Sequence, residues 1–142
     1  SLGLVGSEMC IRDRIDKKAY QEYFRKMHQL FPKCKKMVMA VRNQIASSHH
    51  TLSGLLYDAV EDQLYTTRIY DIEPIVDPMG VGDAFIAAYI HAHQKWGDKN
   101  QYCLDFSLSA SAIKNTVPGD QNLVTEEEII NNMTSSGGRI QR

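Results

Sequence analysis

The chain of 142 residues has few of the features that mark nucleic-acid-binding, membrane or disulfide-rich proteins. It has three cysteines, four prolines and one tryptophan, and its 16 basic and 17 acidic residues leave a net charge of −1. A near-neutral balance argues against a nucleic-acid or membrane-surface partner. No apolar run reaches the roughly 18 residues that a membrane span requires. Hydrophobic residues still make up 43% of the chain, which is enough for the core of one domain.

The cysteines are too few and too scattered for a disulfide framework or a metal site. Cys34 and Cys103 lie far apart in the sequence, and Cys10 falls within the first fourteen residues. The N-terminal residues also lack the charged, apolar and cleavage regions of a signal peptide. We therefore expect a cytoplasmic protein in a reducing compartment.

Residues 1–14 require a separate judgement. Their sequence, SLGLVGSEMCIRDR, resembles the translation of a sequencing adapter, and it has no sustained apolar period. We expect this segment to be an artefact that adds nothing to the fold. The domain is expected to span residues 15–142.

The rest of the chain alternates between helical and extended patterns. Aromatic and apolar residues at a spacing of three to four between Asp16 and Pro32 predict an amphipathic helix with its aromatics in the core. Arg42 is expected at the exit of a strand and His49 and His50 in the following loop. A helix expected over residues 102–115 is rich in small residues, which favour close helix packing or the approach of a flat ligand. The expected strands cover 36–41, 52–57, 63–70 and 72–76, and the later helices cover 84–97, 102–115 and 125–133. This alternation predicts an α/β fold.

The stretch Asp77-Pro78-Met79-Gly80-Val81-Gly82-Asp83-Ala84-Phe85 carries the chemistry. Two glycines one residue apart let the backbone approach a ligand, and the helical run that follows leaves free N–H groups at its start. Asp83 there suits a base that deprotonates a hydroxyl while the amides hold the phosphoryl group under attack. The alternative is a tight turn with Asp83 as an N-cap. A dinucleotide site is disfavoured because Phe85 occupies the place of the third glycine.

The pattern Asp-x-x-Gly-x-Gly-Asp-x-Phe resembles the C-terminal motif of the ribokinase-like (PfkB-type) carbohydrate kinases. Pro78 and Met79 stand where many members have two threonines. Outside the motif, several segments resemble the 2-dehydro-3-deoxygluconokinase branch. These segments are residues 41–42, 54–58, 112–116, 119–122 and 138–142.

The resemblance implies the C-terminal part of a three-layer α/β/α fold and transfer of the ATP γ-phosphoryl group to 2-keto-3-deoxygluconate with Mg²⁺. Asp83 would be the catalytic base, and the amides of Gly80, Val81 and Gly82 would form the anion hole. A monovalent cation would bind near Asp77. The implied nucleotide-binding residues are Arg42, Lys114, Asn115, Gly119 and Asp120. An ordinary surface arginine remains the alternative for Arg42.

Family members are much longer, so the resemblance implies that the N-terminal half and its lid are absent and that this chain alone is inactive. Two other functions stay open. One is a related kinase of another sugar, such as fructose or ribose. The other is a non-catalytic nucleotide-binding module, which would gain nothing from a carboxylate beside phosphate. The implied partners are a sugar acid and ATP, and a homo-oligomeric complete enzyme is left open.

Overall fold

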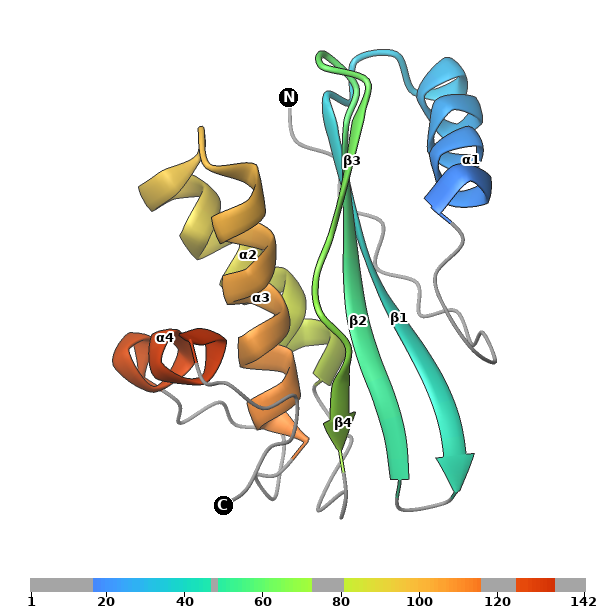
Figure 1. Ribbon diagram of the computed structural model, residues 1–142. Coiled ribbons are helices and arrows are strands. Elements are labelled where there is room, and N and C mark those ends of the chain that lie inside the picture. The colour runs from blue at the N-terminus through green and yellow to red at the C-terminus, as the bar shows by residue number, and fades with distance from the viewer. Residues whose placement is uncertain (1–16, 47–48, 73–80, 116–124, 135–142) are drawn as a thin grey trace.

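The computed structural model describes residues 17–46, 49–72, 81–115 and 125–134. A helix, four strands and three further helices follow one another along the chain (Figure 1). They are α1 (Lys17–Leu30), β1 (Lys36–Ala46), β2 (His49–Asp58), β3 (Gln63–Thr66), β4 (Tyr70–Ile72), α2 (Val81–Trp96), α3 (Asn100–Lys114) and α4 (Glu126–Thr134). No helix among these segments is long and apolar enough to cross a membrane.

The four strands form one antiparallel sheet with β2 at its centre. β1 pairs with one side of β2, and β3 and β4 pair in succession with the other side. Helix α1 covers one face of this sheet, and α2 and α3 cover the opposite face with α4 beyond them (Figure 1). The expected three-layer α/β/α architecture is confirmed.

Strand alternation divides the core between the two faces of the sheet. Met37, Met39 and Val41 of β1 pack toward α1, whereas Val38 and Ala40 pack toward α2 and α3. All five side chains are at most 5% exposed. A strand buried on both faces gives a continuous apolar run, which explains why 36–41 was recognisable in the sequence.

Gly54 of β2 lets α3 approach the sheet closely. A Cβ at this position would lie 3.2 Å from Leu104 Cδ1 and 3.4 Å from Thr67 Cγ2. The Gly54 N–H donates to Thr67 Oγ1 at 2.9 Å, and the Thr67 N–H donates to the Gly54 carbonyl at 3.0 Å. The expected single strand over 63–70 is therefore wrong, because Thr67 interrupts the ladder between β3 and β4.

Helix α1 has the expected bounds but fewer core aromatics than the spacing predicted. Phe24 is fully buried and stacks on Tyr57, with 5.8 Å between ring centroids. Tyr23, Leu30 and Phe31 are 38%, 74% and 59% exposed. Tyr23 is turned about 100° away from Phe24 around the helix. Leu30 ends the helix and Phe31 follows it, so neither shares the face that meets the sheet.

The expected loop over residues 43–50 is also wrong. β1 continues to Ala46, and β2 begins at His49. Arg42 pairs with Leu52 and Gln44 with His50, so the antiparallel ladder runs through both polar segments. Backbone groups make that ladder, and polar side chains therefore do not stop it.

The three later helices are confirmed. In α2 the expected inner face, Phe85, Ala88, Tyr89 and Ala92, is at most 7% exposed. Most of α3 is buried. Ser107 Oγ donates to the carbonyl of Cys103 at 2.6 Å and Ser109 Oγ to that of Ile129 at 2.8 Å, which favours close helix packing for these small residues.

The cap of α4 is confirmed as well. The Glu128 N–H donates to Thr125 Oγ1 at 3.1 Å, the backbone half of a capping box.

Candidate active site

The first turn of α2 presents backbone N–H groups and one exposed carboxylate. The helix begins at Val81, so Gly82 and Asp83 are its second and third residues. N–H groups in a first turn have no carbonyl partner within the helix and lie at the positive end of its dipole. Because Asp83 lies inside the first turn, the N-cap alternative is wrong. Asp83 is exposed and belongs to the same turn as these donors.

Gly82 borders open space. No described atom lies within 4 Å of the position that a Cβ would take at this residue, and its φ is not in the left-handed region. Among the residues that the structure describes, neither packing nor backbone conformation therefore requires glycine at this position. Close approach of a ligand to the helix start does give glycine a reason to be there.

A buried polar pair joins the start of β2 to the end of α3. His50 Nε2 lies 3.2 Å from Asn115 Oδ1, and Asn115 Nδ2 donates to the carbonyl of Ser111 at 3.0 Å. His50 is 3% exposed and Asn115 is fully buried. Since the asparagine oxygen accepts only, the imidazole donates from Nε2.

Arg42 acts on this pair electrostatically. Burial lowers the pKa of His50, and the positive charge of Arg42 lowers it further, against the raising effect of the hydrogen bond to Asn115. Arg42 lies opposite Leu52, whose side chain packs in the core beneath α2 and α3. Alternation places His50 on the same face of the sheet as Leu52. A neutral His50 thus lies close to a cationic Arg42.

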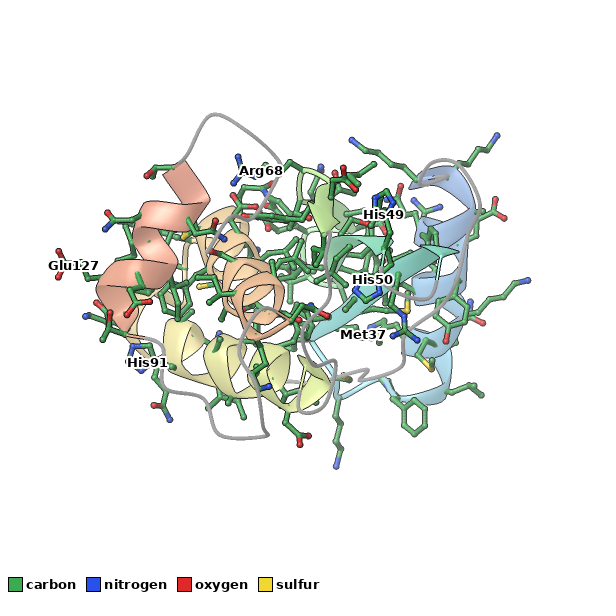
Figure 2. All side chains as sticks on the ribbon, turned by 90° about the horizontal axis from the view of Figure 1, so that it is seen from below. Met37, His49, His50, Arg68, His91 and Glu127 are labelled. Atoms are coloured by element: carbon green, nitrogen blue, oxygen red, sulfur yellow. The ribbon has the colours of Figure 1, made fainter. Side chains whose placement is uncertain are left out.

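Both features lie at one end of the molecule. Figure 1 shows α2 beginning and α3 ending at the lower end of the sheet, where β2 also begins. Figure 2, seen from that end, shows His49 and His50 leaving β2, with His50 beside the end of α3. His49 Nε2 pairs with Asp71 of β4.

The structure gathers only part of the site expected from the sequence. Asp83, Val81 and Gly82 share the start of α2, and Asn115 and Arg42 lie around His50. Lys114 ends α3 and is fully buried. The placement of Arg42 at a strand exit was wrong, because β1 runs four residues beyond it. Four other expected site residues lie outside the described residues, namely Asp77, Gly80, Gly119 and Asp120.

No sequence pattern pointed to His50, which contacts Asn115, one of the expected nucleotide-binding residues. The expectation of a loop at His50 is wrong because β2 begins at His49, among polar residues that give no apolar strand pattern. The spacing of His50 and Leu52, two residues apart, would have placed both on one face once β2 was extended.

Metal ligation has no support within the described segments. No group of three or more His, Cys, Asp or Glu residues gathers there in a way that would hold an ion.

Comparison with known proteins gives matches among solved structures. No protein-family model and no curated protein matches the sequence. The 2-dehydro-3-deoxygluconokinase of Thermotoga maritima superposes with a TM-score of 0.78 at 25% identity, covering 88% of this chain and 37% of the kinase. A PfkB family carbohydrate kinase of Listeria grayi gives 0.75 at 28% identity, with the same shares. A putative 2-keto-3-deoxygluconate kinase of Enterococcus faecalis gives 0.69 at 18% identity, covering 85% and 34%.

The fold and these comparisons thus indicate the class: the chain is similar to the PfkB-type carbohydrate kinases. The Thermotoga maritima and Listeria grayi kinases share about a quarter of their aligned residues with it. The chain spans 37% of the length of these two kinases.

Proposed function

We propose that this chain forms the phosphoryl-transfer end of an ATP-dependent sugar kinase whose acceptor is the sugar acid 2-keto-3-deoxygluconate. The observation that carries the proposal is the start of α2, where an exposed Asp83 shares the first turn with N–H groups that have no partner within the helix, and where no described atom obstructs Gly82. The likeness to sugar kinases, one of them a 2-dehydro-3-deoxygluconokinase, supports the same class of reaction.

The proposed reaction is a direct displacement at phosphorus. The terminal hydroxyl of the sugar acid attacks the γ-phosphorus of ATP, the bond to the β-phosphate oxygen breaks, and ADP leaves. Asp83 accepts the hydroxyl proton as the new O–P bond forms. The amides of Val81 and Gly82, with that of Gly80, would donate to the oxygens of the transferred group. Such fixed donors stabilise developing negative charge without reorganising.

Mg²⁺ would supply charge neutralisation on the phosphates of the nucleotide. This ion commonly binds through substrate phosphates with one or two carboxylates, so it does not need a cluster of protein ligands. That mode is compatible with described segments that contain no such cluster. A monovalent cation near Asp77 remains part of the proposal from the sequence resemblance.

The sharpest test of this function is Asp83→Asn in a chain extended to the length of the kinases it matches. Positioned proton transfer is typically worth roughly 10²- to 10⁴-fold in rate. We expect kcat to fall by about that factor. ATP affinity should hold or rise, because a negative charge near the phosphates is removed. Both are measured by coupled-enzyme kinetics and calorimetry.

Glu127→Gln is the matched control for Asp83→Asn. Glu127 is also an exposed acid in the first turn of a helix, but it belongs to α4 (Figure 2). Neutralising it should leave kcat unchanged. Near-normal turnover of the Asp83→Asn enzyme would remove Asp83 as the base. The 142-residue chain itself is expected to bind MgATP weakly without turning over the sugar acid.

A further inference from the structure

His50 has no role in the mechanism above, yet it is one of the most buried polar residues at this end of the molecule. It is 3% exposed, and its partner Asn115 is fully buried. The two residues are 65 positions apart, and their contact joins the sheet to the end of α3. A buried hydrogen bond of this kind costs more when one partner is lost than its net contribution suggests, because the other partner stays unsatisfied.

The hydrogen bonds show which group donates and which accepts in this contact. His50 Nε2 donates to Asn115 Oδ1, and Asn115 Nδ2 in turn donates to the Ser111 carbonyl one helical turn back. Both hydrogen-bonding ends of the Asn115 amide are therefore engaged. Asn115 is the C-cap of α3, so His50 holds the end of this helix against the sheet.

We propose that His50 is a positioning residue for the nucleotide. It holds Asn115 and the last turn of α3 against β2, beside Arg42, and so fixes Asn115 and Lys114, two of the residues that the sequence resemblance implies for nucleotide binding in the proposed kinase function. The inference rests on that function. His50 acts through Asn115, and no contact of His50 with the substrate is part of the proposal.

A pair of substitutions separates the hydrogen bond from the bulk of the side chain. In His50→Gln the glutamine Nε2 stands near the place of the imidazole Nε2 and still donates to Asn115. His50→Leu keeps an apolar side chain and removes the donor. We expect the Kd of the 142-residue chain for MgATP to rise about 2- to 12-fold in His50→Leu and to stay within about twofold in His50→Gln.

Two further measurements distinguish positioning from a general loss of stability. Amide hydrogen exchange should accelerate at residues 111–115 in His50→Leu but not in His50→Gln. Ser109→Ala is the control, because Ser109 also makes a buried hydrogen bond from α3, to the Ile129 carbonyl at 2.8 Å. It should lower the melting temperature without changing the Kd for MgATP. Asn115→Ala removes the acceptor instead and should match His50→Leu in affinity, which keeps the test open if the leucine variant does not fold.

The outcomes distinguish the positioning role of His50 from the proposed nucleotide-binding function. If the wild-type chain binds MgATP and neither His50→Leu nor Asn115→Ala weakens binding, the positioning role is overturned while the proposed function stands. Equal weakening in His50→Gln and His50→Leu also overturns it, because the donor would then not matter. If the wild-type chain shows no binding at millimolar MgATP, the nucleotide function fails, and the positioning role with it.

Discussion

Gly82→Ala is expected to stabilise the protein against unfolding while weakening its binding of phosphate. Gly82 is the second residue of α2, and a Cβ there meets no described atom within 4 Å. Glycine costs a helix up to about 1 kcal/mol relative to alanine. Because the added methyl group causes no clash, we expect the free energy of unfolding to rise by about 0.5–1 kcal/mol. For a chain of this size that raises the melting temperature by roughly 1–4 °C.

Phosphate binding should change in the opposite direction. If the amides at the start of α2 hold an anion, the new Cβ occupies the side from which the anion approaches. Loss of one hydrogen bond to a charged group is worth about 1.5–3 kcal/mol. The Kd for MgATP is therefore expected to rise about 10- to 150-fold.

The assay combines a thermal melt with calorimetric titration of MgATP on the same samples. Gly54→Ala is the matched control, because its Cβ would lie 3.2 Å from Leu104 Cδ1 beneath α3, within the core. It should lower the melting temperature and leave the Kd unchanged. Unaltered MgATP affinity in Gly82→Ala would refute the anion site at α2. A lower melting temperature would refute the placement of Gly82 in open space.

Three further predictions concern the fold. Phe24→Ala should destabilise the protein by about 3–5 kcal/mol in urea denaturation, because the ring is fully buried, whereas Leu30→Ser should stay within about 0.5 kcal/mol, since Leu30 is 74% exposed. Equal effects would contradict the placement of α1. Hydrogen bonds from Arg25 lower the pKa of Asp62 to about 2. The stability that this pair adds should be present above pH about 4 and be lost as the pH falls toward 2. Urea titrations across this range should show that loss in the wild type and much less of it in Asp62→Asn. Deleting residues 1–14 should leave the melting temperature unchanged, and a fall of several degrees would show that they belong to the fold.

Local patterns in the sequence were sufficient for the helices and for the start of α2. A helix makes its hydrogen bonds within one segment, so its apolar period and its capping residues are both visible in a short window. The buried face of α2 and the cap at Thr125 were predicted in this way and are confirmed. The glycines and Asp83 likewise needed only the knowledge that a helix follows them.

The sheet and the buried end of α3 required the tertiary structure. Whether the strand ends at Arg42 or continues beyond it depends on backbone hydrogen bonding with another segment. Here Arg42 pairs with Leu52 of β2, and the strand continues. The burial of Phe24 and the exposure of Leu30 depend on which part of α1 packs against the sheet. The contact of His50 with Asn115 joins residues 65 positions apart, and no local period encodes it. The sequence alone determined which segments form helices and where the glycine-rich start of α2 lies, because these depend on neighbouring residues. Only packing decided which polar side chains were brought together, because that depends on surfaces that meet after the chain has folded.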